Sequence, residues 1–220
     1  MKPRCSNRRN QALTLFEVLV TILTLLVLMA FLGLQFTESD SRKKAMRISC
    51  VNNLKEIDLA ARIWEGNHGG QYPMAVSTTN GGAMELAMTG NAVIPFQVMS
   101  NELSTPKILL CPADDDHSPA TNFTTGFTTQ HISYFVNLSA TEQSPQMLLF
   151  GDDNFESNGI PVKSGLLPFS TTATIIWGPT RHVRNGNVTI TAGSVQQLTT
   201  AGLQQALRDS GFATNHILIP

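Results

Sequence analysis

The chain has 220 residues, which is enough for one soluble domain and a membrane anchor but too few for two full domains. Charged residues make up only 14% of it. The formal net charge is −1. Residues 1–12 contain four basic residues and no acidic one, so the rest of the chain has 11 basic and 16 acidic residues. An acidic remainder without a stripe of Lys and Arg argues against binding to phosphate backbones, so we expect no nucleic-acid partner.

The first predicted element is an apolar helix over residues 13–36. Its residues 18–36 form a run of 19 without a formal charge, close to the roughly 20 residues that cross a hydrocarbon core. The basic residues upstream fit the positive-inside rule, so we predict a single membrane span with an extracytoplasmic remainder. The alternatives are a buried helix, which seldom runs this long without charge, and a cleaved signal peptide, whose apolar core is usually about 7–15 residues.

Glu17 is a lone carboxylate near the start of this apolar segment. Burying an unpaired carboxylate in lipid is unfavourable, by about 2.5 kcal/mol at mid-membrane and by less near the end of a span. We therefore expect Glu17 to have a partner, the alternative being a position among the lipid headgroups.

The sequence ALTLFEVLV, residues 12–20, resembles the N-terminal cleavage and methylation motif of type IV prepilins and type II secretion pseudopilins. The resemblance implies that residues 1–12 are a leader, that a prepilin peptidase cuts between Ala12 and Leu13, and that Leu13 is then methylated. It makes Glu17 the fifth mature residue, where it would neutralise the terminal ammonium of a neighbouring subunit. Ala12 replaces the usual Gly and Leu13 the usual Phe, which bears on the efficiency of processing more than on its position.

The helix is predicted to continue over residues 37–66 as an amphipathic extracytoplasmic half. Apolar residues recur there at three- and four-residue steps, which is typical of a helix with one buried face. This face comprises Val51, Leu54, Ile57, Ala61 and Trp64, while the other faces carry Lys55, Glu56, Asp58, Arg62 and Glu65. Helix-ending residues follow directly at Gly66, Gly69, Gly70 and Pro73.

Residues 67–220 are predicted to form a globular head. Weak helical patterns cover residues 82–88 and 95–103, and a short closing helix is predicted at residues 200–210. Strands are predicted at residues 107–111, 131–137, 146–151, 173–177, 187–191 and 194–198. The last two flank a turn at Ala192-Gly193, which favours an antiparallel meander. The expected fold class is α+β with a long N-terminal helix packed on an antiparallel sheet, the type IV pilin-like fold that the resemblance implies.

Four stretches, scattered over most of the chain, resemble G-type pseudopilin-like proteins: residues 49–55, 110–112, 133–136 and 149–152. Many of those proteins also carry a His, nine further residues and then Asp-Gly. In this chain His182 is followed after nine residues by Ala192-Gly193, so the Asp is missing. Because Asp-Gly is a signal for a hairpin turn, we interpret this degenerate motif as a folding signature and His182 as a packed structural residue.

The three cysteines cannot all pair within one chain. Cys5 lies in the basic segment that is predicted to be removed, which leaves Cys50 and Cys111 as a candidate disulfide in an oxidising compartment. Two unpaired, buried thiols are the alternative.

None of the common catalytic or cofactor-binding motifs occurs, and the five histidines are scattered without ligand spacing. We therefore expect no catalytic residue, no metal ligand and no cofactor. Two acidic clusters, Asp114-Asp115-Asp116 and Asp152-Asp153, offer oxygen ligands of the kind that Ca²⁺ prefers. Adjacent carboxylates without EF-hand spacing are more typical of a solvated turn.

These features together predict a structural subunit, a pseudopilin anchored in the inner membrane with a periplasmic head. Its expected partners are a prepilin peptidase, identical and different pilin subunits, an inner-membrane assembly platform and membrane lipid. The alternatives are a minor pilin whose head is a surface-binding module, and a signal-anchored hydrolase that uses His182 with Asp152 or Asp153.

Overall fold

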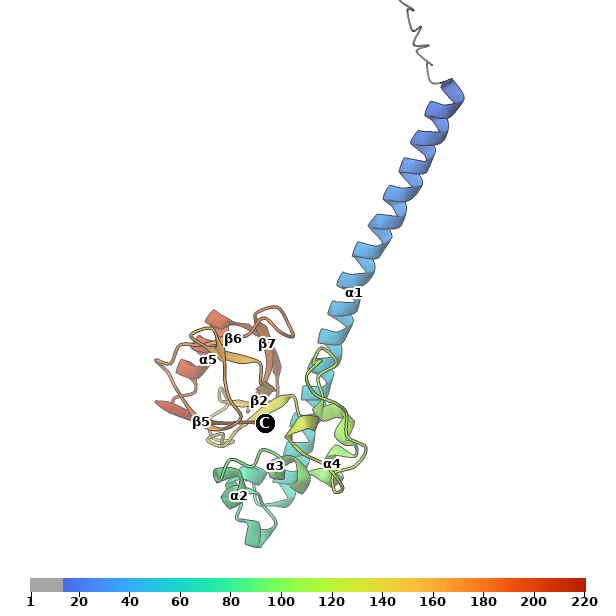
Figure 1. The fold of residues 1–220 in the computed structure, drawn as a ribbon. Helices are drawn as coiled ribbons and strands as arrows, with labels where there is room; N and C mark the ends of the chain where they lie inside the picture. Colours follow the sequence, from blue (N-terminus) through green and yellow to red (C-terminus); the bar gives the residue numbers. More distant parts are fainter. Residues whose placement is uncertain (1–13) are drawn as a thin grey trace, which may run out of the picture. The chain divides into compact units, whose positions relative to one another are not determined.

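The computed structural model describes residues 14–220, apart from the side chains of residues 33–40 (Figure 1). Its contacts divide the chain into two compact units with a boundary between Lys44 and Ala45. Helix α1, Leu15–Asn67, contributes residues to both units. The second unit, called the head below, contains every strand of the described residues.

In the first unit, the apolar side chains of residues 15–32 of α1 are exposed among the residues that the structure describes. Its residues 15–32 form a segment of 18 residues that is long and apolar enough to cross a membrane, and none of it is buried. Leu15, Phe16 and Met29, for example, are 87%, 73% and 69% exposed. A membrane anchor and a signal sequence both have this character.

In the head, α1 buries one side, which holds four residues of the predicted apolar face, Leu54, Ile57, Ala61 and Trp64. Cys50 is buried on this side as well. Val51 is only half-buried. Asp58 and Glu65, which were expected on the solvent side, are buried as well. For Asp58 the reason is an ion pair with Arg62 one turn later, with 2.9 Å between Nε and Oδ2. The helix ends one residue later than predicted.

Short helices connect α1 to the sheet: η1 Pro73–Ala75, η2 Thr78–Asn80, α2 Met84–Met88, α3 Ile94–Val98, α4 Ser100–Leu103, η3 Pro106–Leu109 and η4 Thr129–His131. The helical patterns predicted for residues 82–88 and 95–103 are confirmed by α2, α3 and α4. The strand predicted for residues 107–111 is wrong, because Pro106 opens a 3-10 helix there. The Thr105 hydroxyl caps this helix by accepting a hydrogen bond from the Lys107 N–H.

The head is built on a six-stranded sheet with the order β5-β9-β1-β2-β7-β8, and β4-β3-β6 form a smaller sheet. All the strand pairs are antiparallel. The strands are β1 Tyr134–Asn137, β2 Leu148–Asp152, β3 Phe155–Ser157, β4 Ile160–Pro161, β5 Gly165–Ser170, β6 Ile175–Trp177, β7 Asn185–Ile190, β8 Val195–Thr199 and β9 Thr214–Ile219.

The sequence predicted five of these strands, β1, β2, β6, β7 and β8, and the β7–β8 hairpin is confirmed. It missed β3, β4, β5 and β9. The predicted helix at residues 200–210 is α5, Thr200–Asp209, but it does not close the fold. β9 follows it and inserts between β5 and β1, so the sheet as a whole is not a simple meander.

The two faces of the large sheet bury two separate hydrophobic clusters. Tyr134 and Val136 of β1 join the cluster that contains the buried face of α1. Phe135, between them, joins the cluster that contains Trp177 of β6 and the buried leucines of α5. This alternation follows from strand geometry, in which successive side chains point to opposite faces. Figure 1 accordingly shows α1 and α5 on opposite sides of β2 and β7.

The turn at Ala192-Gly193 lies between β7 and β8 and contacts α1. Gly193 has φ +89°, whereas Ala192 is not in the left-handed region. The turn therefore needs its glycine but accepts an alanine at the position before it. Arg62 of α1 donates a hydrogen bond to the carbonyl of Thr191, and a Cβ on Gly193 would lie 3.1 Å from the Arg62 guanidinium.

Replacing Gly193 with Ala tests this account of the turn. The left-handed backbone alone should cost about 1–2 kcal/mol, and crowding against Arg62 should add to it. Gly126→Ala is the matched control, because Gly126 has φ +72° but open space around its Cβ position. Denaturant unfolding should show a larger loss of stability for Gly193→Ala than for Gly126→Ala. Equal losses would mean that the contact with Arg62 contributes nothing.

Candidate functional site

The structure places the residues singled out from the sequence in two regions. Ala12 and Leu13, the predicted cleavage and methylation positions, lie outside the described residues. Glu17 belongs to the first unit. The head holds the remaining five: Cys50, Cys111, His182, Ala192 and Gly193.

Glu17 caps the start of α1. The backbone N–H of Thr14 donates to Glu17 Oε2 at 2.8 Å, and the Thr14 hydroxyl donates to the same oxygen at 3.1 Å. In return, the Glu17 N–H donates to Thr14 Oγ1 at 3.3 Å. This reciprocal arrangement is a capping box, whose Thr-x-x-Glu signature is visible in the sequence. Glu17 therefore has a partner within its own chain.

Cys50 and Cys111 form a disulfide in the structure. Cys50 lies on the buried face of α1, and Cys111 follows η3, so the bond ties the helix to the segment that leads into β1. Both residues are fully buried. The backbone N–H of Cys111 donates to Ser133 Oγ at 3.0 Å, which fixes this segment beside the sheet.

His182 lies next to the disulfide and next to the end of β2. Its Nε2 is 3.4 Å from Cys111 Sγ and 3.4 Å from Asp152 Oδ2. Burial, helped by the charges of Arg47 and Arg181, lowers the pKa of His182 to about 4, so the imidazole is neutral at pH 7. This agrees with its interpretation as a packed residue.

Asp152 is fully buried on β2. Burial raises the pKa of its carboxyl to about 7, against two hydrogen bonds that its Oδ2 accepts from Asn187. The structure thus brings together His182 and Asp152, the pair considered for a hydrolase. The His182 side chain is only 3% exposed and that of Asp152 is 0% exposed. A substrate would therefore meet neither group at the surface.

A buried ion-pair cluster around Arg181 lies beside His182. The Arg181 guanidinium is 2.7 Å from Asp114 and 2.5 Å from Asp153, and it also donates to the carbonyl of Ser133 at 2.9 Å. All three charged side chains are at most 7% exposed. The expectation that both acidic clusters form solvated turns is therefore wrong for these carboxylates. Burying them is tolerable because one guanidinium serves both.

Further hydrogen bonds stabilise the charge on Asp114. Its Oδ2 accepts from the Ser133 hydroxyl at 2.6 Å and lies 2.9 Å from His117 Nδ1, and its Oδ1 accepts from the Asp116 N–H. Burial acts to raise the pKa of Asp114, but Arg181 and these bonds outweigh it and hold the pKa below its ordinary value. Burial raises the pKa of Asp153, although Arg181 opposes the shift.

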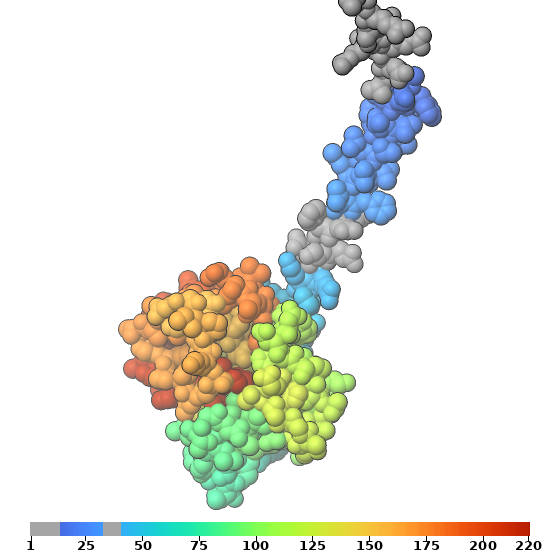
Figure 2. Space-filling view, in the orientation of Figure 1, coloured from blue at the N-terminus to red at the C-terminus, as the bar shows by residue number. Residues whose placement is uncertain are grey.

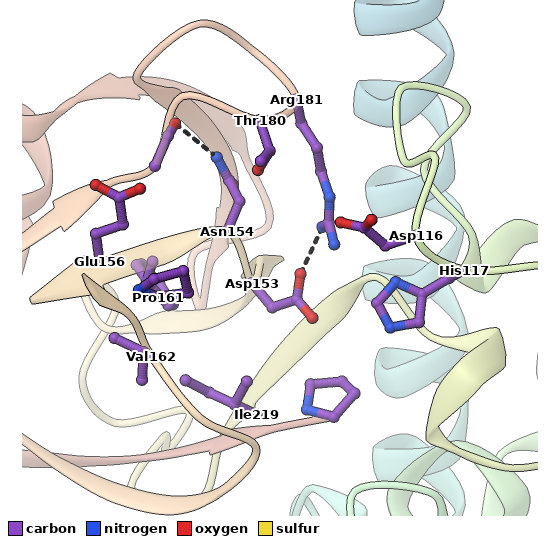
Figure 3. Close-up of a pocket in the computed structure, with 13 residues that line it drawn as sticks. Asp116, His117, Asp153, Asn154, Glu156, Pro161, Val162, Thr180, Arg181 and Ile219 are labelled. Carbon is purple, nitrogen blue, oxygen red and sulfur yellow. Dashed lines mark hydrogen bonds and ion pairs between the residues drawn. The ribbon is translucent and has the colours of Figure 1, made fainter. Parts of the chain in front are cut away.

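A cavity of about 230 Å³ opens beside this cluster. Figure 3 shows Arg181 and Asp153 pointing toward one another at its edge, with His117, Asn154 and Glu156 around it. The cavity lies between two segments that Figure 2 shows as adjacent yellow-green and orange regions of the head. Its mixed polar and apolar lining suits a small ligand, but it is smaller than the roughly 300–1,000 Å³ of typical small-molecule sites.

Sequence reasoning missed the residues that organise these groups. Arg181 precedes the motif histidine directly, but its partners Asp114 and Asp153 come from distant segments, and no local spacing indicates this pairing. Asn187 and Ser133 were also missed for that reason. Thr14 was missed although its capping-box signature could have revealed it.

Replacing Asp114 with Asn tests the cluster. It removes one carboxylate from a buried guanidinium, so the free energy of unfolding at pH 7 should fall by about 3 kcal/mol. Because the folded pKa of Asp114 lies below its unfolded value, this stabilisation is complete above the unfolded pKa, near about 4, and is lost as the pH falls through the folded pKa. The difference between wild type and Asp114→Asn should therefore shrink below about pH 4. Fluorescence of the buried Trp64 and Trp177 reports unfolding.

The matched control is Asp115→Asn, because Asp115 is the exposed neighbour in the same acidic triplet. It should change the stability by less than about 0.5 kcal/mol at either pH. A difference between wild type and Asp114→Asn that stays constant on acidification would contradict the ion-pair account.

The comparisons with known proteins found no match. No protein-family model matches the chain, and no curated protein or solved structure is significantly similar to it.

Proposed function

We propose that this protein is a structural subunit of a type IV pilin-like or type II secretion fibre, a pseudopilin made as a membrane-anchored precursor. In this proposal a prepilin peptidase cuts between Ala12 and Leu13, and Leu13 is methylated. The subunit then leaves the inner membrane through an assembly platform, and its apolar helix packs against those of other subunits. The head faces the periplasm and decorates the fibre.

The observation that carries the proposal is the uncovered apolar helix of residues 15–32 with a carboxylate in its first turn. The described residues of the chain bury no residue of this segment, and lipid or other chains would cover its apolar surface. For a simple membrane anchor, lipid alone would cover the apolar surface. The Glu17 carboxylate, in the first turn of this helix, adds a charge that favours a positively charged partner.

A second observation supports packing of α1 against other subunits. Ile48, Leu59 and Ile63 are 63%, 57% and 47% exposed although they are large and apolar. Their spacing of 11 and 4 residues places them on one side of α1, because 3.6 residues complete a turn. The buried residues Leu54 and Ala61 lie on the opposite side. These three residues, called the outer strip below, are left uncovered by the head. Leu59 and Ile63 are adjacent in it, whereas the exposed polar residues Asn52 and Lys55 separate them from Ile48.

Glu17 has two candidate roles, which the structure allows to be separated. One is the capping of its own helix through Thr14. The other is the neutralisation of the ammonium group at Leu13 of a neighbouring subunit, which would set the register between helices. The first role needs a hydrogen-bond acceptor at this position, whereas the second needs a negative charge.

A minor pilin is the second candidate function. The cavity beside Arg181 favours it, because a recess lined by charged and apolar groups offers a place for one small group of a bound partner. The two candidates differ in stoichiometry: a structural subunit is abundant along the fibre, whereas a tip module is present in few copies. Quantitative mass spectrometry of purified fibres distinguishes them.

Two variants separate the roles of Glu17. Glu17→Gln keeps an acceptor for the capping hydrogen bond but removes the charge. Thr14→Ala removes both hydrogen bonds of the Thr14 hydroxyl but keeps the charge. We expect Glu17→Gln to remain in the membrane and to enter sheared fibres at least about tenfold less than wild type, as the loss of about 1.4 kcal/mol per contact implies. Thr14→Ala should enter fibres nearly normally. The opposite pattern would assign Glu17 to capping alone.

The outer strip of α1 is tested by Leu59→Lys. Because Leu59 is exposed in the single chain, the free energy of unfolding should change by less than about 0.5 kcal/mol. Incorporation into fibres should fall, since a charge would enter an apolar contact between helices. Leu86→Lys is the control, because Leu86 is an exposed leucine of α2, away from the strip. Equal incorporation of both variants would remove the strip from the proposal.

A further inference from the structure

Three side chains from separate segments of the head converge on one buried point. Cys50 comes from α1, Cys111 from the segment after η3, and His182 from the segment before β7. Their Sγ and Nε2 atoms all lie within 4.8 Å of one another, and all three residues are buried. Two sulfurs and an imidazole nitrogen are the ligands that Zn²⁺ prefers.

A fourth ligand group lies next to the histidine of this cluster. Asp152 Oδ2 is 3.4 Å from the His182 Nε2 that also faces Cys111. The second oxygen, Oδ1, is buried and has no hydrogen-bond partner among the described residues. A buried carboxylate oxygen without a partner is unfavourable, and coordination of a cation would satisfy it.

The backbone geometry suits a shared ion as well as a disulfide. The Cα atoms of Cys50 and Cys111 are 5.1 Å apart. In a tetrahedral zinc site the ligand atoms lie roughly 3.3–3.8 Å from each other, as bond lengths of about 2.0–2.3 Å require. Once the S–S bond is open, rotation of the two cysteine side chains can separate the sulfurs to this distance.

The surrounding charge also suits a divalent ion. Two thiolates and one carboxylate exceed the charge of Zn²⁺ by one negative unit. Arg47 lies one turn before Cys50 on α1, and its Nε and Nη2 are buried without a hydrogen-bond partner among the described residues. Its positive charge acts on both His182 and Asp152. A zinc complex at this point would therefore be neutral overall once Arg47 is included.

We propose that the dithiol form of the head binds one Zn²⁺ through Cys50, Cys111, His182 and Asp152, and that this site and the disulfide are mutually exclusive states. Both cysteines are thiols when the chain is made. Zn²⁺ binding displaces the two thiol protons and leaves two thiolate ligands. Formation of the disulfide removes two electrons to a disulfide oxidant and releases the ion. The proposal is independent of the proposed fibre function.

The test uses the full chain in detergent with Cys5→Ser, so that only the proposed cysteine ligands remain as thiols. A phosphine reductant opens the disulfide; each sulfur gains a proton, and the phosphine becomes its oxide with oxygen from water. Zn²⁺ is then titrated against a chromogenic chelator. We expect one Zn²⁺ per reduced chain and none per oxidised chain. Substitution with Co²⁺ should give the absorption of a tetrahedral site with thiolate ligands.

Variants identify the ligands. His182→Gln should weaken Zn²⁺ binding by at least about tenfold, because even loss of an outer-shell partner costs about 10–100-fold. His117→Gln is the matched control, a head histidine bonded to Asp114 and not to this cluster, and it should bind Zn²⁺ as wild type does. Protection of both thiols from alkylation by Zn²⁺ gives a second measurement for a variant that folds poorly.

Three outcomes would overturn the proposal. The first is that the reduced chain does not bind Zn²⁺. The second is that reduced wild type and reduced His182→Gln bind Zn²⁺ equally. The third is a Co²⁺ spectrum without thiolate ligation. The second outcome would show that the two cysteines alone capture the ion, as they would in an unfolded chain.

Discussion

Arg181 places a full positive charge inside the head, and the arrangement of the neighbouring segments depends on pairing it. Asp114 comes from the segment after η3 and Asp153 from the end of β2, and both reach the same guanidinium. A buried charge without partners would destabilise the fold strongly, so these three segments must meet. Because His182 follows Arg181 directly, the same constraint sets the imidazole beside the disulfide. Charge pairing thus decides where the chemically active groups of the head lie.

Much of the fold could be predicted from local sequence patterns, and what was missed depends on contacts between distant residues. The apolar run, the buried face of α1 and the β7–β8 hairpin each follow from a period or a turn signal within a few residues. β9 was missed because a polar start, Thr214-Asn215-His216, masks its apolar end, although Asn215 is buried against Asn137. The candidate site was less predictable still. Only the tertiary structure brings the carboxylates of Asp114 and Asp153 to Arg181, and no local sequence pattern indicates these ion pairs.

Helix α1 has a side that is buried within the head and apolar side chains that are exposed. Within the head, one side is buried against the sheet and the other carries exposed isoleucine and leucine side chains. Over residues 15–32 the apolar side chains are exposed on every side of the helix. Covering these exposed apolar side chains with lipid or with other helices would remove them from water and stabilise the helix. Local capping by Thr14 and intermolecular pairing by Glu17 are compatible, because the capping bonds occupy one carboxylate oxygen only.

The position of β9 has a consequence for the order of folding. This strand is the last along the described chain, yet it lies inside the large sheet, where it pairs with β5 on one side and β1 on the other. While residues 214–219 are still inside a ribosome or a translocation channel, β9 cannot take its place between β5 and β1. Until it is released, β5 has no partner in this sheet and β1 has an open edge. The head therefore completes its sheet only after this segment has been released, from an intermediate in which these two edges are exposed.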